Sequence, residues 1–162
     1  MPKKQIIFSA CILLAAAAAL LWLLRPAPEP VTGGPIGTAT LTVSCENLLG
    51  DSRADPSLLA AVPADGLLIP PAAVEVLEGD TAFSLLERVC AERGLALEAQ
   101  RGIGSVYVQG IGGVREFDCG PLSGWLFRIN GEIRSTDSGS VVLQDGDILE
   151  FLYTCELGED ID

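Results

Sequence analysis

Four cysteines are the residues best suited to chemistry in this sequence: Cys45, Cys90, Cys119 and Cys155. They are widely spaced, and the sequence has neither a C-x-x-C pair nor a histidine, so it lacks the clustered ligands typical of a zinc site. An even number of cysteines favours disulfide bonds in a small exported domain. The N-terminus of this chain predicts that the domain is exported. We therefore expect two disulfides, with free buried thiols as the alternative.

Carboxylates are the other candidates for chemistry, and they are scattered over predicted turns. Asp118 precedes Cys119, while Asp145 and Asp147 flank a glycine; turn chemistry explains all three aspartates without a catalytic or calcium-binding role. With no histidine and no serine in a nucleophile-elbow pattern, general-base and nucleophilic chemistry have no visible constellation. We predict a protein that is not an enzyme and that has no metal ion or cofactor of its own.

Trp125 is the aromatic residue that most invites a functional interpretation. It follows Gly124 in a strand-like stretch that ends at Asn130-Gly131, a pair that favours a tight type I′ hairpin. Such a tryptophan is either part of the core or a platform for a ligand. Because the flanking residues are those of a packed hairpin and no polar catalytic group accompanies them, we predict that Trp125 belongs to the core.

The charge of the chain excludes one large class of partner. All 22 acidic residues lie after Arg25, against seven arginines and no lysine there, which gives that part of the chain a net charge of −15. Such a charge repels phosphate backbones and anionic lipid surfaces. We therefore predict that the protein does not bind nucleic acid.

Residues 6–24 form an apolar run without a charged side chain, about long enough to cross a membrane as a helix. Lys3 and Lys4 precede the run, and basic flanks favour the cytoplasmic side. We predict a signal-anchor over residues 1–25 that holds a single-pass protein in the cell membrane, with the remainder extracytoplasmic. The alternative is a cleaved signal peptide, whose apolar region is usually shorter. Cys11 lies inside the run rather than after it, which disfavours a lipoprotein cysteine.

Beyond the anchor the sequence divides into a tether, a domain and a short tail. Residues 26–39 are rich in proline and glycine and lack apolar periodicity, as expected of a solvated linker. Residues 40–158 carry the patterns of a folded domain. Residues 159–162 are predicted to be an acidic tail.

Apolar periodicity within the domain predicts one long helix and several strands. Residues 78–94 have an amphipathic stripe, with Asp80 or Thr81 as the N-terminal cap and Gly94 as the left-handed end. A shorter helix is predicted over residues 56–61. Strands are predicted over residues 40–45, 67–69, 73–77, 95–98, 105–109, 124–130, 140–143 and 147–154. This order predicts an α+β fold in which one sheet packs against one main helix.

Three stretches, GDTAFSLLERVC, SVYVQGIGGVREFDCGPLSGWLFRINGEI and LQDGDILEFLYTCELG, resemble the transcobalamin-like C-terminal domain family found on bacterial surfaces. They resemble more distantly the C-terminal β-domain of transcobalamin and intrinsic factor. The resemblance covers residues 41–158. It implies a β-grasp-like mixed sheet curled around the helix, with the first strand beside the last.

The resemblance also implies a pattern of disulfides. With the first strand beside the last, Cys45 would lie near Cys155 and bond to it. Cys90 and Cys119 would then join the helix to the sheet. Related domains often have a cysteine after the Asn-Gly hairpin, where this chain has serine and threonine, so Cys90 either replaces that partner or stays free.

The same resemblance implies a set of ligand-binding candidates. In the vertebrate cobalamin carriers a corrinoid lies between this kind of β-domain and a helical barrel, and this chain contains no such barrel, so at most half of such a site is expected. The residues that match the carrier segment near the ligand are Tyr107, Ser123, Gly124, Trp125 and Phe127. Each of them has a structural role as its alternative.

Two functions follow from these observations. The first is a membrane-anchored, extracytoplasmic and non-catalytic binding module that presents a small, corrinoid-like ligand to a surface protein or transporter. The second is a structural domain without a small ligand that docks to another surface protein through a sheet edge. Affinity for a corrinoid distinguishes the two.

The apolar run predicts how the protein behaves during membrane fractionation. We expect the full-length chain to stay with the membrane pellet after washing with high salt and then with alkaline carbonate, because an inserted helix is not released by either treatment. Immunoblotting of pellet and supernatant measures this. A soluble product that begins within residues 26–37 would show that the run is cleaved instead.

Overall fold

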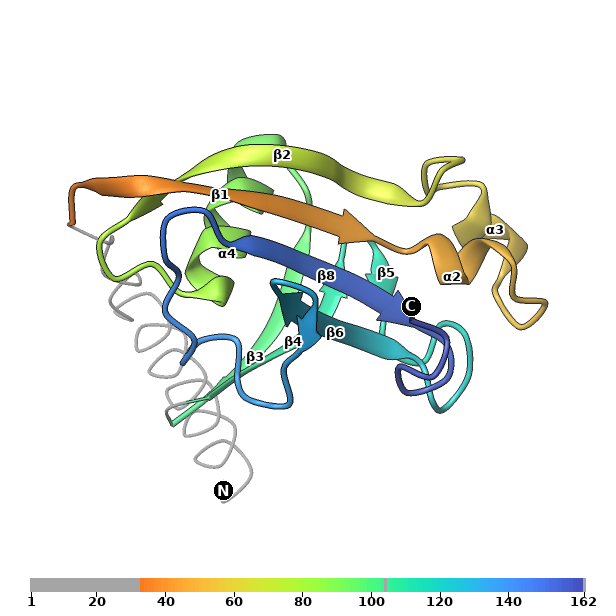
Figure 1. Cartoon of the computed structure of the whole chain (residues 1–162). Helices are drawn as coiled ribbons and strands as arrows, with labels where there is room; N and C mark the ends of the chain where they lie inside the picture. The colour runs from red at the N-terminus through yellow and green to blue at the C-terminus, as the bar shows by residue number, and fades with distance from the viewer. Residues whose placement is uncertain (1–32, 104, 162) are drawn as a thin grey trace, which may run out of the picture. The chain divides into compact units, whose positions relative to one another are not determined.

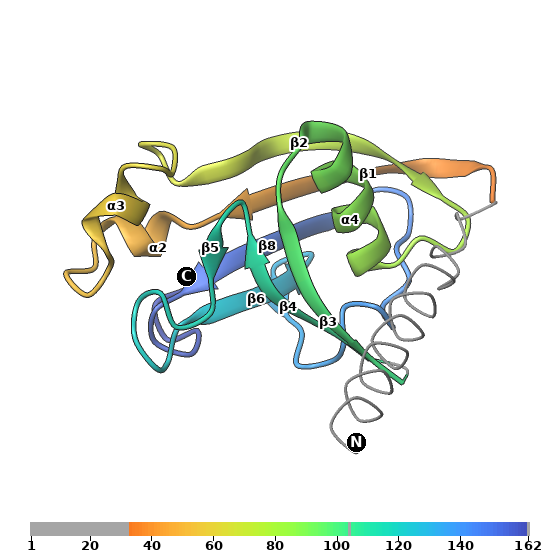
Figure 2. The same cartoon turned by 180° about the vertical axis from the view of Figure 1, so that it is seen from behind.

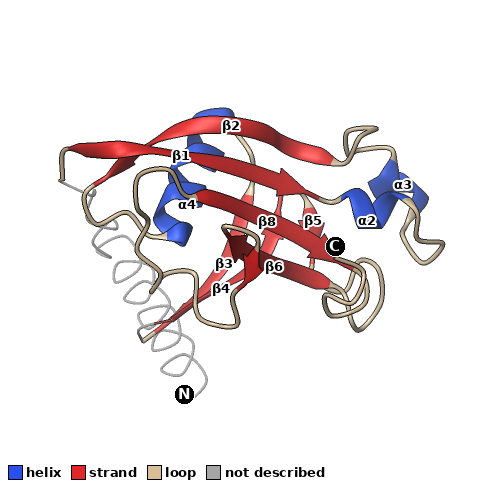
Figure 3. Ribbon diagram, viewed as in Figure 1, coloured by secondary structure: helices blue, strands red, loops and turns tan. Residues whose placement is uncertain are grey.

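A computed structural model describes residues 33–103 and 105–161. The predicted anchor, residues 6–24, lies outside the described residues, as does half of the predicted tether, residues 26–32. Within the described ranges no helix is long and apolar enough to span a membrane. The described chain is an α+β domain with few helices, in which strands predominate, as the colouring of Figure 3 makes clear.

The larger of two sheets is mixed and has the strand order β2-β1-β8-β6-β7. Its strands are β1 (Pro35–Ser44), β2 (Leu67–Leu77), β6 (Gly124–Ile129), β7 (Glu132–Ile133) and β8 (Ile148–Thr154). Strand β1 pairs in parallel with β8, from Thr40 opposite Ile148 to Ser44 opposite Leu152, whereas the other neighbours are antiparallel. The first strand therefore lies beside the last, as the resemblance implies (Figure 1).

A second sheet and the main helix cover one face of the larger sheet. The second sheet is antiparallel, in the order β3 (Leu97–Gly102), β4 (Ser105–Ile111) and β5 (Val114–Arg115). Figure 2 shows this sheet and helix α4 (Ala82–Arg93) together in front of β1 and β8. The core contains fully buried side chains from both layers, among them Leu41, Val43, Leu85, Leu86, Leu149 and Phe151.

Helix α4 begins and ends as its sequence predicts. The Thr81 hydroxyl accepts from the Ser84 amide at 3.1 Å, and the Ser84 hydroxyl accepts from the Thr81 amide at 2.8 Å, so Thr81 is the cap. Gly94 ends the helix in the left-handed region, with φ of 68°. Asp80 is buried one residue before the cap and pairs with Arg88 at 2.6 Å, which ties the start of the helix to its middle.

The predicted strands 67–69 and 73–77 are one continuous strand, β2, that passes through Pro70-Pro71. A proline lacks an amide hydrogen and is tolerated only at a sheet edge or a bulge. Strand β2 is an edge strand, and its register with β1 shifts between Leu41 and Val43, opposite the two prolines. Both conditions are therefore met, and the prolines interrupt the ladder without ending the strand.

Several other boundaries differ from the sequence prediction; for example, the strand predicted over residues 95–98 is β3, Leu97–Gly102. Strand β1 begins at Pro35, so residues 35–39 belong to the sheet rather than to the tether. Residues 140–143 form no strand; only Val142 forms an isolated bridge, to Thr81. Near the C-terminus, Asp160 accepts a hydrogen bond from the Cys155 amide at 2.8 Å, so the predicted acidic tail folds back onto the end of β8. Two short helices, α2 (Glu46–Leu49) and α3 (Pro56–Leu59), complete the described chain.

The pH dependence of stability tests whether Cys90, which is buried on α4, is a free thiol. Burial raises its pKa from 9.0 to about 11, so the folded chain retains a proton that the unfolded chain loses near pH 9. This contribution to stability is complete below pH 9 and is lost as the pH rises through 11, which lowers the free energy of unfolding by about 2–3 kcal/mol.

Urea denaturation of wild type and Cys90→Ala at pH 8 and pH 11 measures this effect. The stability difference between the two proteins should shrink at pH 11. A difference that stays constant between the two pH values would contradict a free buried thiol at Cys90.

Candidate functional site

A cleft of about 240 Å³ lies between β4, β6 and the loop at residues 134–138. Its walls are mostly apolar on the strands and polar on the loop. The lining residues are Val106, Tyr107, Val108, Trp125, Leu126, Phe127, Arg134, Ser135, Thr136, Asp137, Ser138 and Phe151. Hereafter this is called the β4–β6 cleft.

Three of the five residues predicted to bind a ligand line the β4–β6 cleft. Tyr107 comes from β4 and is 51% exposed, whereas Trp125 and Phe127 come from β6 and are each 7% exposed. The cleft thus has an accessible aromatic ring at its rim and two buried rings in its wall. Ser123 and Gly124, the other two predicted residues, do not line the cleft.

Trp125 is buried because β6 alternates strictly along its length. Trp125, Phe127 and Ile129 face the core, and the residues between them face outward. The indole nitrogen of Trp125 donates to the Val114 carbonyl at 2.9 Å, and its ring meets the Tyr153 ring edge-to-face at 5.3 Å between centroids. Trp125 is therefore a core residue, as predicted, that also contributes to the wall of the cleft.

Aromatic stacking also orders the inner part of the cleft. The rings of Phe127 on β6 and Phe151 on β8 stack at 5.7 Å between centroids, because the two residues are directly opposite each other in the antiparallel ladder. Their position is set by backbone pairing in the centre of the sheet. An apolar group that enters the cleft therefore meets a surface that is already organised.

Tyr107 is held at the rim by its hydroxyl group. The hydroxyl donates to a Glu116 carboxylate oxygen at 2.7 Å, and the Gln109 amide donates to the other oxygen at 3.1 Å. The hydrogen bond to Glu116 raises the pKa of Tyr107, so the phenol stays protonated at physiological pH. This contact fixes the orientation of a ring that is half exposed.

The polar side of the cleft, which the sequence did not predict, is fastened to three elements. One carboxylate oxygen of Asp137 accepts from the Val106 amide at 2.7 Å, which joins the loop to β4. The Arg134 amide donates to the Phe127 carbonyl at 3.0 Å and joins it to β6, while the Ser138 carbonyl accepts from Phe83 at the start of α4. The only indication of this loop in the sequence was the turn-forming stretch after Ile133.

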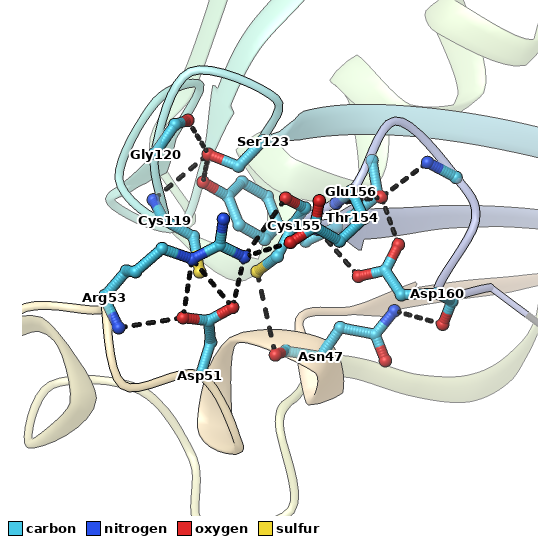
Figure 4. A network of polar contacts seen from close by, with 12 residues as sticks. Asn47, Asp51, Arg53, Cys119, Gly120, Ser123, Thr154, Cys155, Glu156 and Asp160 are labelled. Carbon is cyan, nitrogen blue, oxygen red and sulfur yellow. Dashed lines mark hydrogen bonds and ion pairs between the residues drawn. The ribbon is translucent and has the colours of Figure 1, made fainter.

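Ser123 and Gly124 lie at the start of β6, and Ser123 has a structural role. The Ser123 hydroxyl accepts from the Cys119 amide at 3.1 Å and donates to the Gly120 carbonyl at 2.8 Å (Figure 4). It also lies 3.0 Å from the Tyr153 hydroxyl. These contacts shape the loop that precedes β6, so the alternative structural interpretation holds for Ser123.

A second cluster of chemically capable groups lies beside that loop. Ligand atoms of Asp51, Cys119 and Cys155 are all within 4.8 Å of one another, the one such group with three members in the described part of the chain. The Arg53 guanidinium donates hydrogen bonds to both carboxylate oxygens of Asp51. Its Nε lies 2.9 Å from one oxygen, and a terminal nitrogen lies 2.5 Å from the other. This cluster combines soft thiols with a carboxylate that already has a cationic partner.

All four cysteines of the described domain are buried thiols in this structure. The Cys45 thiol donates to the Gly66 carbonyl at 3.3 Å, and Cys119 has Cys155 as its sulfur neighbour. The predicted pairs, Cys45 with Cys155 and Cys90 with Cys119, stay predictions. The two cysteines that lie side by side in the structure are instead Cys119 and Cys155.

Comparison with known proteins agrees with the family resemblance. Residues 79–154 match the model of a family described as a domain of unknown function (DUF4430). Haptocorrin in complex with Cbi shares 17% sequence identity at a TM-score of 0.53, over 76% of this chain and 27% of the haptocorrin chain. A Ruminococcus gnavus protein provisionally named as metal-binding is 15% identical at a TM-score of 0.44, over 73% of this chain and 96% of its own. No curated protein sequence matches this chain.

The similarity to haptocorrin shows a shared fold alone. The match spans 27% of the haptocorrin chain, about a quarter of its length. The resemblance to a transcobalamin-like domain, stated from the sequence, is confirmed by the family match and the haptocorrin fold together.

The burial of Trp125 predicts a large stability effect that is absent at the rim of the same cleft. Trp125→Ala should lower the free energy of unfolding by about 3–5 kcal/mol, because it removes a buried ring and leaves a cavity. Tyr107→Ala should change it by about 0.5 kcal/mol or less, since the ring is half exposed. Urea denaturation followed by far-UV circular dichroism measures both. Equal stability of Trp125→Ala and wild type would show that Trp125 is not part of the core.

Proposed function

We propose that the chain is a non-catalytic binding module whose ligand site is the β4–β6 cleft, a proposal supported by the match of residues 79–154 to a domain of unknown function and by the fold shared with haptocorrin. The observation that supports this most strongly is the meeting of Tyr107, Trp125 and Phe127 in one cleft. These residues come from two strands in different sheets, and nothing in local sequence requires them to meet. We also propose that the fold is β-grasp-like. The parallel pairing of β1 with β8 in the centre of the larger sheet supports this.

The size of the cleft limits what can enter it. Sites for drug-sized molecules are typically about 300–1,000 Å³, and this cleft has about 240 Å³. A small planar or apolar group fits this volume, and a corrinoid-like ligand would insert only one edge. The structure of haptocorrin with Cbi makes a corrinoid the first ligand to try. The remaining surface of such a ligand would be available to a partner.

The apolar run at residues 6–24 supports the cellular setting of this proposal. It would anchor the chain in the cell membrane and leave the acidic domain outside, tethered near the surface. The net charge of −15 after Arg25 would keep the domain away from anionic headgroups and nucleic acid. In this position the module would present its ligand to a transporter or a surface protein.

Docking of a protein strand is the second candidate function, and one feature of β6 favours it. Strand β7 pairs with β6 only at Arg128 and Ile129, and the Arg134 amide bonds to the Phe127 carbonyl, so within the described residues no strand pairs with the outer edge of Gly124–Leu126. An extended peptide could add to this edge by backbone hydrogen bonds. It would occupy the same side of β6 as the cleft.

Fluorescence titration tests the ligand hypothesis on the full chain in detergent. The chain has two tryptophans, so a Trp22→Phe background leaves Trp125 as the single reporter in the wall of the cleft. We expect cyanocobalamin to quench this fluorescence saturably, because bound corrinoid would lie close to the indole. Tyr107→Ala should weaken the affinity at least about tenfold, which corresponds to about 1.4 kcal/mol.

Ile148→Ala is the matched control, since Ile148 is similarly exposed but does not line the cleft. Its affinity should equal that of the parent. Quenching that never saturates up to about 1 mM, after correction for light absorption, would contradict corrinoid binding and leave strand docking as the favoured function.

A further inference from the structure

Cys119 and Cys155 lie beside each other at the end of the large sheet. Cys119 is in the loop before β6, and Cys155 directly follows β8; Gly124 and Thr154 are opposite each other in the β6–β8 ladder. The antiparallel pairing therefore brings the start of one strand to the end of the other. The two sulfur atoms lie within 4.8 Å, and the residues are 0% and 2% exposed (Figure 4).

Separate backbone contacts hold each cysteine in its place. The Cys119 amide donates to the Ser123 hydroxyl at 3.1 Å, within a turn in which Gly120 has a φ of 101°. The Cys155 amide donates to the Asp160 carboxylate at 2.8 Å. The two thiols thus lie side by side because both backbones are fixed, and a covalent bond requires the two sulfur atoms to approach to about 2.0 Å.

We infer that Cys119 and Cys155 form a disulfide bond that fastens the loop before β6 to the end of β8. The bond closes a loop that contains β6, β7 and β8. It fixes the position of the residues that lead into Trp125. This pairing differs from both pairs that the family resemblance implies.

The chemistry of the cluster favours a disulfide over a metal centre. Two thiols and one carboxylate could bind a soft divalent cation, but both carboxylate oxygens of Asp51 already accept from Arg53. The Arg53 guanidinium also bonds to Glu156 at 2.6 Å, so a second positive charge would lie next to a fixed one. A disulfide is neutral and needs no further ligand from this chain.

Bond formation balances as a thiol–disulfide exchange with a small disulfide such as oxidised glutathione. A thiolate of the pair attacks that disulfide and forms a mixed disulfide with one of its halves. The second thiol of the pair then attacks the mixed disulfide and releases the small thiol. Two S–H bonds of the protein and the S–S bond of the oxidant break, one S–S bond forms in the protein, and the oxidant, reduced by two electrons, leaves as two thiols that carry the two protons. Burial raises the pKa of both Cys119 and Cys155 in the folded chain, so the reactive thiolate is scarce there. The bond should therefore form during folding, before the loop closes over the sulfurs.

Peptide mapping of the exported full chain tests the bond directly. A Cys11→Ser background removes the fifth cysteine of the sequence. Cells are lysed in a denaturant that contains an alkylating reagent, so that buried thiols also react, and the protein is digested with trypsin without reduction. We expect the peptide of residues 116–128 to be linked to that of residues 135–162, with Cys90 alkylated in the peptide of residues 89–93.

The mapping has three results that would overturn the inference. These are alkylation of both Cys119 and Cys155, linkage of either one to Cys45 or Cys90, and stoichiometric zinc with thiols that react only after chelation. Each result identifies a different state of the same sulfurs.

Melting temperatures provide a second measurement with a matched control. Dithiothreitol should lower the melting temperature of wild type and of Cys90→Ser by about 10 °C, and should leave Cys119→Ser unchanged. An equal shift in Cys119→Ser would contradict the bond. If Cys119→Ser does not fold, the mapping of the Cys11→Ser protein decides. Corrinoid binding is not needed for any of these readouts.

Discussion

The parallel pairing of β1 with β8 is the interaction on which the rest of the domain depends. It joins the beginning and the end of the folded chain in the middle of the larger sheet, from Thr40 opposite Ile148 to Ser44 opposite Leu152. Side chains on the inner side of both strands, such as Leu41 and Phe151, are almost completely buried beneath α4 and the second sheet. Because these contacts are distant in sequence, they are entropically costly to form, and the buried apolar surface must offset that cost.

The position of β8 has two consequences along β6. Near the middle of the ladder it places Phe151 opposite Phe127 and Tyr153 opposite Trp125, which builds the aromatic wall of the β4–β6 cleft. At its far end it brings Cys155 to the loop that carries Cys119. The ligand site and the inferred disulfide therefore share one structural cause. A shift of register between β6 and β8 would displace both.

The β4–β6 cleft exists because the two sheets do not join. Strand β6 pairs with β8 on one side and only briefly with β7 on the other, so β4 faces it without a ladder. The loop at residues 134–138 spans this gap, and Asp137 secures it to the Val106 amide. The result is an apolar wall with a polar border, which is the usual composition of a small-molecule site.

Local patterns in the sequence predicted the parts of the fold that local physics controls. The capping residues of α4 and the Asn130-Gly131 hairpin were identifiable because each depends on a few adjacent residues. The adjacency of β1 and β8 came only from the family resemblance. Asp137 contacts Val106 across 31 positions, and Cys119 meets Cys155 through strand register, so neither leaves a local signal. The continuity of β2 through Pro70-Pro71 was missed because its position at the sheet edge is a tertiary property.

Hydrogen exchange of the full chain, with and without cyanocobalamin, tests the central claim that the β4–β6 cleft is a ligand site. The ligand should slow exchange in residues 106–108, 125–127 and 134–138 and leave helix α4 (Ala82–Arg93) unchanged. These segments line one cleft but are separate in the sequence, so joint protection would locate the ligand between them. Bound cyanocobalamin that protects other segments and leaves these unchanged would contradict the account.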